Sequence, residues 1–500
     1  MKLVDQYLKA IEKDLRLSKL QVNTEEVGAV SEVKDGVVII NGLDNVSYGE
    51  LIEFESGVQG YVIELNEDEI GVIVLGNYLQ IKAQEEVKAL GKTLSIPVGN
   101  NLIGRVIDPL GNPLDSKDRV KTDTLYPVEK VAPSVVQRKP VNVPLATGII
   151  AIDSLIPIGR GQRELIIGDR GTGKTTIALD SILNQKSEGV ICIYCGIGQK
   201  DSKIAGVVDL LTKFGAMEYS VVLTASASHP ASLQYIAPYA ASAIAEYFMD
   251  KGRDVLVVYD DLTKHAWAYR QISLILRRPA GREAYPGDIF YLHSRLLERA
   301  CRKDEKFGGG SITALPIVET LEGDVSSYIP TNIISITDGQ MFLETDLFNA
   351  GIRPALNVGI SVSRVGGNAQ TKAMKKVAGR LKLDLAQYRE MAAFSQFESE
   401  LDEDTKKFLN RGSKLTHILT QKKHKPYSLA LEVALIWAGN HGFFDTIPVL
   451  GIEEFQNRLV TYISSKGKEW VKRINKNKTL EEKDEKELEE MIKDQLKLFQ

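Results

Sequence analysis

The sequence predicts a multidomain protein with a small N-terminal β-barrel, a central α/β domain and a C-terminal α-helical bundle. Three observations support this order. Short apolar runs broken by glycines come first, apolar strands then alternate with helical segments, and the remaining sequence has few glycines and many charges. The expected boundaries are an N-terminal helix over 1–24, the barrel over 25–93, the α/β domain over 94–370 and the helical domain over 371–500.

The composition argues against nucleic-acid binding and membrane insertion. A chain of 500 residues is too long for one compact core, and 43% hydrophobic and 26% charged residues are typical of soluble globular proteins. The net charge of -4 provides no global basic field for nucleic acid. No apolar run approaches the roughly 18 residues of a membrane span. Asp5, Glu12 and Asp14 interrupt the N-terminus, so we expect no signal peptide and a cytoplasmic protein.

The first segment is expected to form an amphipathic helix. Val4, Leu8, Ile11 and Leu15 have helical spacing, with charges between them. Their apolar stripe either docks on a partner or packs on the next domain, and the sequence leaves both possibilities open.

Residues 27–89 have the pattern of a small antiparallel barrel. Apolar runs at 36–40, 51–54, 61–65 and 70–75 are separated by turn residues. Five or six strands at such close spacing favour a closed barrel. We find no candidate catalytic residue in this segment.

The α/β part contains a phosphate-binding loop. Residues 168–175, GDRGTGKT, match the pattern G-x-x-x-x-G-K-[ST]. A buried-strand pattern precedes the loop and a helical face follows it, so backbone N–H groups and the positive end of the helix dipole converge on one point. We expect Lys174 to reach the β- and γ-phosphates of a nucleotide and Thr175 to bind Mg²⁺. The residues expected to line the phosphates are Asp169, Arg170, Gly171, Thr172, Gly173, Lys174, Thr175 and Thr176.

A second nucleotide-binding signal follows downstream. Residues 255–259 form a β-branched, apolar run that ends in Asp260 and Asp261. Beside a phosphate loop, an acid at the end of a central parallel strand holds Mg²⁺, usually through water. We therefore expect Asp260 to join Thr175 at the metal.

Cys192 and Cys195 have C-x-x-C spacing, which is also found in redox and metal sites. They lie within one buried-strand pattern, however, and residues three apart on a strand point to opposite faces. Neither a second cysteine pair nor a nearby histidine completes a zinc site. We expect reduced cysteines in the core.

The end of the chain is expected to be an amphipathic helix of the C-terminal bundle. Its apolar face is formed by Leu488, Met491, Ile492, Leu496 and Phe499.

Motifs over most of the chain resemble the alpha subunit of the F-type ATP synthase, the non-catalytic nucleotide-binding subunit of an alternating hexameric head. They are PIGRGQRE at 157–164, the phosphate loop, GQK at 198–200, YDDL at 259–262, AYRQ at 268–271, GREAYPGD at 281–288 and SVSRVG at 361–366.

The resemblance implies a RecA-like central domain, bound ATP or ADP with Mg²⁺, and beta subunits as partners in the hexamer. It also implies a central shaft (gamma) subunit surrounded by the C-terminal bundle and a peripheral stalk (delta) subunit at the N-terminal end. The membrane is then contacted only through the complex, so the chain would be peripheral, on the cytoplasmic side of the cell membrane.

The resemblance also assigns roles to individual residues. Gln199 stands where the catalytic beta subunit has a glutamate that polarises the attacking water, and an amide is no base at neutral pH. This implies nucleotide binding with little turnover, although some GTPases orient water with a glutamine. Arg353 and Pro354 match a segment that lines the nucleotide. Arg364 matches the arginine finger that acts in the catalytic site of the neighbouring beta subunit.

Two positions depart from the family pattern. The family usually has glutamine at the positions of Gly171 and Lys423, and both positions lie near the alpha-subunit nucleotide by resemblance. The loss of two amides and the gain of a lysine are changes that can alter base selectivity or affinity. Gln421 is retained, so we expect Gln421 and Lys423 beside the nucleotide.

Two alternative functions remain compatible with the sequence. A self-sufficient hexameric ATPase, such as a helicase or a secretion-type ATPase, is disfavoured by Gln199 and by the alpha-like motifs. An alpha-like subunit of a head that is not coupled to proton flow is compatible with every motif described.

Overall fold

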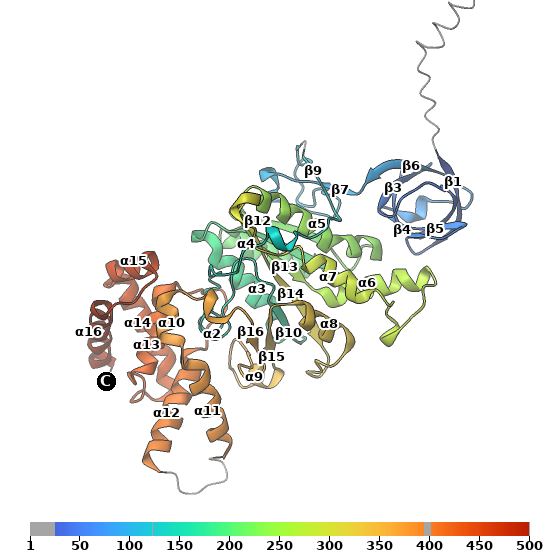
Figure 1. Cartoon of the computed structure of the whole chain (residues 1–500). Coiled ribbons are helices and arrows are strands. Elements are labelled where there is room, and N and C mark those ends of the chain that lie inside the picture. The colour runs from blue at the N-terminus through green and yellow to red at the C-terminus, as the bar shows by residue number, and fades with distance from the viewer. Residues whose placement is uncertain (1–25, 123, 395–401, 500) are drawn as a thin grey trace, which may run out of the picture. The chain divides into compact units, whose positions relative to one another are not determined.

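The computed structural model describes residues 26–122, 124–394 and 402–499 (Figure 1). The helix expected over 1–24 lies outside the described residues. The chain divides into two compact units, Met1–Leu94 and Ser95–Gln500, and each is described by itself.

The first unit is a closed, antiparallel, six-stranded barrel in the order β1-β2-β5-β4-β3-β6, so the predicted barrel is confirmed. Apolar side chains such as Val30, Ile40, Ile52 and Val72 are completely buried inside it. Because side chains alternate across a strand, one set fills the barrel. The strands are β1 (Val27–Lys34), β2 (Val37–Gly42), β3 (Glu50–Phe54), β4 (Gln59–Leu65), β5 (Glu69–Val74) and β6 (Glu86–Thr93).

The second unit contains an eight-stranded sheet in the order β16-β15-β10-β14-β13-β11-β12-β8. Neighbouring strands are parallel, apart from the antiparallel pair β15 and β16. Burial of the central strands explains their continuous apolar runs. The strands are β8 (Val106–Ile107), β10 (Leu165–Asp169), β11 (Ile191–Ile197), β12 (Ser220–Ala225), β13 (Asp254–Asp260), β14 (Ser311–Thr320), β15 (Gly339–Leu343) and β16 (Val362–Ser363), and β7 (Ser95–Pro97) pairs separately with β9 (Leu125–Pro127).

Helices connect the parallel strands, as crossover connections require. Among them, α3, α5 and α6 pack directly against the sheet. They are α2 (Ile150–Leu155), α3 (Lys174–Leu183), α4 (Asp201–Lys213), α5 (Ala231–Asp250), α6 (Leu262–Ile275), α7 (Ile289–Leu297), α8 (Tyr328–Ile336) and α9 (Thr345–Asn349).

Parallel pairing brings the two predicted nucleotide motifs to the same edge of the sheet. β14 pairs with both β10 and β13, so the carboxyl ends of these two strands are near each other. The phosphate loop follows β10 and Asp260 ends β13. Ligands of open α/β sheets bind at this edge.

The end of the second unit is helical, so the predicted C-terminal helical domain is confirmed. Figure 1 shows its helices gathered beside α2, which packs against α10 and α11. They are α10 (Lys372–Ala378), α11 (Leu381–Phe394), α12 (Glu403–Ile418), α13 (Leu429–Asn440), α14 (Ile452–Ser465), α15 (Lys468–Asn477) and α16 (Glu482–Phe499).

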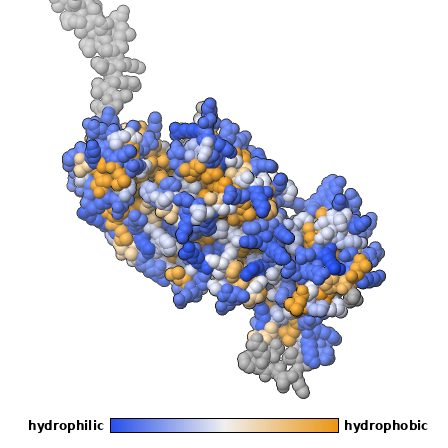
Figure 2. All heavy atoms as spheres, turned by 180° about the vertical axis from the view of Figure 1, so that it is seen from behind, coloured by the Kyte–Doolittle hydropathy of each residue, from blue (hydrophilic) through white to orange (hydrophobic). Residues whose placement is uncertain are grey.

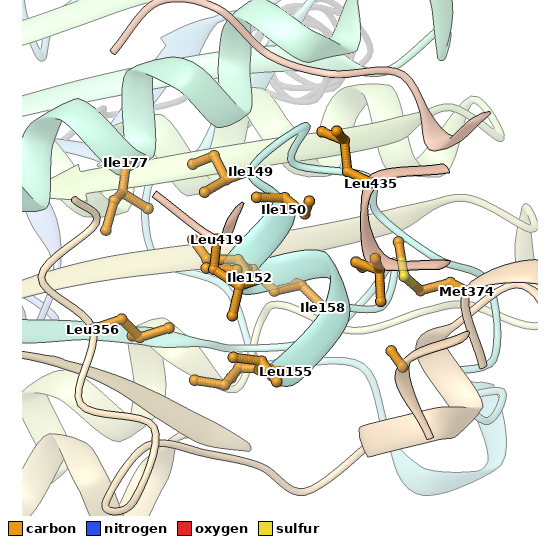
Figure 3. Close-up of a cluster of buried hydrophobic side chains, with 14 of the residues drawn as sticks. Ile149, Ile150, Ile152, Leu155, Ile158, Ile177, Leu356, Met374, Leu419 and Leu435 are labelled. Atoms are coloured by element: carbon orange, nitrogen blue, oxygen red, sulfur yellow. The ribbon is translucent and has the colours of Figure 1, made fainter. Parts of the chain in front are cut away.

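One hydrophobic cluster continues from the sheet region into these helices (Figure 3). Ile152 of α2 and Ile177 of α3 belong to it, and so do Met374 of α10 and Leu435 of α13. All four are less than one-twentieth exposed. The helix that begins at the phosphate loop and the C-terminal helices therefore share one core.

The three cysteines are buried and free, in agreement with the expectation of reduced core residues. On the face shown in Figure 2, hydrophobic patches are interrupted by hydrophilic residues. In the part of the sequence that the structure describes, every helix is too short or too polar to cross a membrane.

Two buried carboxyl groups meet inside the shared core. Asp153 of α2 accepts hydrogen bonds from the backbone N–H of Thr147 and of Gly148, both at 3.0 Å, and from the Thr147 hydroxyl at 2.7 Å. Glu432 of α13 faces it, and both residues are buried. Burial raises the pKa of Asp153 to about 6 and raises the pKa of Glu432 well above its ordinary value.

We predict that Glu432→Gln stabilises the protein more at pH 8 than at pH 5. A carboxyl group whose folded-state pKa is raised binds a proton that the unfolded state releases. The free energy of unfolding therefore falls as pH rises from the unfolded pKa to the folded pKa, by up to about 1.4 kcal/mol per pH unit for each such proton. The amide of the variant does not titrate. Urea unfolding at both pH values measures the difference, with the exposed Glu469→Gln as the control; parallel pH profiles for wild type and Glu432→Gln would contradict it.

Candidate functional site

The phosphate loop is the turn between β10 and α3, and glycines determine its shape. A Cβ atom at Gly168 would lie 2.4 Å from the carbonyl oxygen of Leu343. Gly173, the N-cap of α3, has a φ of 98°, a left-handed conformation that favours glycine. The N–H groups of the first turn of α3 have no partner within the helix, so they are available to an anion at the loop.

Lys174 folds back over the loop. Its Nζ donates hydrogen bonds to the carbonyl oxygens of Gly168 at 2.7 Å and Asp169 at 2.6 Å. Burial lowers the pKa of Lys174, while nearby carboxylates act in the opposite direction. The loop therefore already holds a buried cation next to the helix N-terminus.

The Asp169 carboxylate connects the phosphate loop to neighbouring segments of the chain. Its carboxylate accepts hydrogen bonds from the Thr320 hydroxyl at 2.7 Å, the Gly323 N–H at 2.8 Å and the Thr345 hydroxyl at 3.2 Å. Partial burial raises the pKa of Asp169, but these hydrogen bonds outweigh burial and lower it overall. The Thr172 hydroxyl donates to the Asp169 carbonyl at 2.8 Å. These two side chains are occupied in shaping the loop.

The other predicted loop residues are more open. Arg170 and Gly171 are exposed, and Thr176 is half-buried on α3. A Cβ atom at Gly171 would meet no heavy atom within 4 Å, although its φ of 88° favours glycine. Gly171 therefore leaves space at the exposed side of the loop.

The two predicted metal ligands meet at the carboxyl edge of the sheet. The Thr175 hydroxyl donates to the Asp260 carboxylate at 2.8 Å, and the Tyr194 hydroxyl donates to the same oxygen at 2.7 Å. Mg²⁺ prefers oxygen ligands and is usually held by one or two carboxylates together with water and phosphate oxygens, so this pair fits the ion. Among the described residues no group of three or more His, Cys, Asp or Glu side chains is arranged for a metal, so the fit depends on phosphate oxygens.

Gln199 is buried beside Asp260, and both ends of its amide are occupied. Its Nε2 donates to the Asp260 carboxylate at 2.8 Å and lies 3.3 Å from the Asp261 carboxylate. Its Oε1 accepts from the Nζ of Lys203 at 3.1 Å and from the Nζ of Lys264 at 3.0 Å. Two acids and two lysines therefore orient the amide.

Sequence reasoning missed three of these neighbours. Lys203 lies in the first turn of α4, directly after the Gln199 motif, and Lys264 lies in the first turn of α6, directly after Asp261. Proximity to the motifs was the available signal for both lysines. Tyr194 has no comparable signal, because it reaches Asp260 across the pairing of β11 with β13.

The structure brings Arg353 and Gln421 together. The Gln421 N–H donates to the Arg353 carbonyl at 2.7 Å. The Gln421 side chain, however, is bound to backbone: it donates to the Gly148 carbonyl at 2.7 Å and accepts from the Ile150 N–H at 3.0 Å. The Arg353 guanidinium is exposed and lies 4.7 Å from the centre of a phenylalanine ring, and Pro354 follows it through a cis peptide bond.

Lys423 is exposed next to a contact with α3. The neighbouring His424 donates its backbone N–H to Asp180 of α3 at 3.0 Å, and its Nδ1 lies 2.9 Å from the same carboxylate. Burial raises the pKa of Asp180, and the charge of Lys423 acts in the opposite direction. The 421–424 segment is thus fixed to the helix that begins at the phosphate loop.

Arg364 lies near the amino ends of the parallel strands, whereas the phosphate loop lies at their carboxyl ends. Ser363 of β16 pairs with Gly339, the first residue of β15, and the Arg364 N–H donates to the Asp338 carbonyl at 2.8 Å. β10 runs parallel to β15 and leads away from this edge towards the loop. At roughly 3.3 Å per residue, the five residues of β10 span about 13 Å from the amino end of the strand to its carboxyl end.

The backbone at Arg364 is firmly held, whereas its side chain is exposed. Arg163 binds the Asp338 carboxylate through Nε at 2.9 Å and Nη2 at 2.8 Å. The Arg364 guanidinium makes one long hydrogen bond of 3.5 Å to the Ile334 carbonyl. In the described ranges, no hydrogen bond or ion pair joins Arg364 to the phosphate loop.

Comparisons with known proteins agree over nearly the full length. Residues 148–363 match the nucleotide-binding domain of the ATP synthase alpha/beta family, residues 370–495 match the C-terminal domain of the same family, and residues 23–91 match its β-barrel domain. The ATP synthase subunit alpha of Petrotoga mobilis is 55% identical over 99% of both proteins. Those of Dehalococcoides mccartyi and Aquifex aeolicus are 56% and 54% identical, over 95% and 99% of this protein and 94% and 98% of their own length. The protein therefore belongs to the ATP synthase alpha/beta family, among its alpha subunits.

Proposed function

We propose that this subunit binds ATP or ADP with Mg²⁺ at its own phosphate loop without turning it over, and that it donates Arg364 to the catalytic site of an adjacent beta subunit in an alternating hexamer. One observation carries the proposal. The groups proposed to bind the nucleotide lie at the carboxyl ends of the parallel strands, with the amide of Gln199 among them. The exposed Arg364 lies near the amino ends.

Binding follows from charge and backbone geometry. Lys174 and the first N–H groups of α3 face the same loop, so they hold the β- and γ-phosphates. Thr175 and Asp260, which meet through a hydrogen bond, would hold Mg²⁺. When bound, the ion would offset the negative charge of the phosphates.

The absence of turnover follows from Gln199. A carboxylate at this position can both orient water and accept its proton, whereas an amide accepts no proton at neutral pH. Gln199 is also held at both ends by Asp260, Lys203 and Lys264. Rotating it towards a water molecule would break charge-assisted hydrogen bonds, which are stronger than neutral ones. The subunit therefore keeps its nucleotide.

The proposed role of Arg364 is in trans. A guanidinium that reaches a γ-phosphate stabilises the charge that develops in the transition state. Arg364 is exposed, and the sheet lies between it and the loop of its own subunit. Its fixed backbone and exposed side chain support a contact with a neighbouring subunit.

Arg353, Pro354, Gln421 and Lys423 are proposed to form the side of the site that receives the base and ribose. The hydrogen bond between Arg353 and Gln421, and the attachment of the 421–424 segment to α3, support this placement. In this arrangement Gln421 supports the backbone, and the exposed Arg353 and Lys423 contact the nucleotide.

An exposed apolar segment supports assembly with partners. Val131, Val135 and Val136 are 90%, 86% and 79% exposed, although valines are usually buried. We propose that beta subunits cover this segment. The central shaft (gamma) subunit, the peripheral stalk (delta) subunit and a peripheral position on the cytoplasmic side of the membrane complete the proposed setting.

We predict that Lys174→Ala removes nucleotide from this subunit's own site while the assembled head still turns over. The substitution deletes the cation that faces the phosphates. Nucleotide released by denaturing the washed complex measures retention. The exposed Lys186→Ala, just beyond the other end of α3, is the control and should retain nucleotide. Equal retention in Lys174→Ala and wild type would refute the assignment.

We predict that Arg364→Ala lowers turnover of the assembled head by about 10³- to 10⁵-fold, the contribution of known arginine fingers. Nucleotide retained in this subunit should stay at the wild-type level, because Lys174, Thr175 and Asp260 are unchanged. Arg364→Lys should not restore full turnover, since an ammonium lacks the planar two-pronged geometry of a guanidinium.

The assay compares hexamers of verified size, because a purely structural arginine would instead prevent assembly. Arg253→Ala is the matched control, since Arg253 is exposed and directly precedes β13 at the same edge of the sheet as Arg364. Near-normal turnover by intact Arg364→Ala hexamers would exclude the finger.

A further inference from the structure

The metal end of the site contains a cation, Lys203, to which the proposed function assigns no role towards the metal or the nucleotide. The Nζ of Lys203 lies 3.1 Å from the Thr175 hydroxyl, 3.1 Å from the Asp260 carboxylate and 3.1 Å from the Gln199 amide oxygen. The second carboxylate oxygen of Asp260 is 3.5 Å away. One ammonium group therefore bridges the two proposed metal ligands.

The ammonium suits this position chemically. It is a compact point charge with three donors and no acceptor, and three oxygen-bearing groups surround it here. The Asp260 side chain is only 2% exposed, and a buried carboxylate needs a counter-charge. Lys264 pairs with the neighbouring Asp261 at 3.5 Å, so Lys203 is the lysine that neutralises Asp260.

The Lys203 side chain is also able to move away from Thr175 and Asp260. Its side chain is 39% exposed, and it is carried on the first turn of α4 by a flexible stem. Lys174 is different, because it is buried and bound to the loop carbonyls. The site thus has one fixed cation at the phosphate loop and one displaceable cation at the metal ligands.

We propose that Lys203 is a tethered substitute for Mg²⁺ beside Asp260, so that this site holds a nucleoside triphosphate with or without the metal. The inference rests on the proposed nucleotide binding at the same site. Without the metal, the ammonium shields the phosphates from the Asp260 carboxylate. With the metal, the exposed stem of Lys203 gives the side chain a path to solvent.

The test measures the Kd of ATP for the purified full-length protein by calorimetry, in excess Mg²⁺ and in excess EDTA. The wild type should bind with similar Kd in both solutions, within about threefold. Lys203→Met keeps the length of the side chain and removes its charge. In EDTA it should raise Kd about tenfold, which corresponds to about 1.4 kcal/mol, while its Kd in Mg²⁺ changes less than about twofold.

Two further variants complete the design. Lys203→Arg keeps the charge and should restore most of the binding in EDTA. Lys213→Met removes an exposed charge from the other end of α4 and should behave as wild type. Equal dependence on Mg²⁺ in wild type and Lys203→Met would overturn the inference while leaving the proposed binding site intact. Failure of wild type and all variants to bind ATP in either solution would overturn the proposed function itself.

Discussion

The buried carboxylate of Asp260 is the constraint on which the site depends. A carboxylate is stable inside a protein only when its charge and lone pairs are satisfied. Here Thr175, Tyr194, Gln199 and Lys203 all bind it, from four different parts of the fold. The start of α3, strand β11, the segment between β11 and α4, and the first turn of α4 are thereby fixed around the end of β13. Protein hydrogen bonds therefore hold in place the side chains that we propose bind the metal.

The shared core explains how the C-terminal helices take part in the site. α2 and α3 pack into one hydrophobic cluster with α10 and α13, and the 421–424 segment is bound to Asp180 on α3. The Gln421 amide also connects this segment to the start of α2, through hydrogen bonds to the backbone of Gly148 and Ile150. A movement of the C-terminal helices would therefore pull on the helix that begins at the phosphate loop. This coupling is a property of packing within one subunit.

The sequence was sufficient for the barrel, the order of the parts and the meeting of Thr175 with Asp260. The barrel and the order of the parts follow from local pattern alone. The meeting of Thr175 with Asp260 also needs the rule that neighbouring parallel strands have their carboxyl ends on the same side of the sheet. The sequence was insufficient where a role depends on partners distant in the sequence. The placement of Asp169 along the phosphates stays a prediction, but no sequence pattern indicates that its carboxylate is bound by Thr320, Gly323 and Thr345. The placement of Gln421 beside the nucleotide stays a prediction, but no sequence pattern indicates that its amide is bound to backbone. Tyr194 was missed because motifs record spacing along the sequence and not the contacts made across a sheet, whereas proximity to the motifs was an available signal for Lys203 and Lys264.

The central claim is that the subunit keeps the nucleotide that it binds while catalysis proceeds elsewhere in the head. The most direct measurement loads the purified protein with ATP labelled at the γ-phosphate, assembles it with its beta partner and starts turnover with excess unlabelled ATP. We predict that the label remains as bound ATP through many turnovers of the head, because the amide of Gln199 is no base and Arg364 is proposed to act in the site of a beta subunit. Release of labelled phosphate at the turnover rate of the head would contradict it.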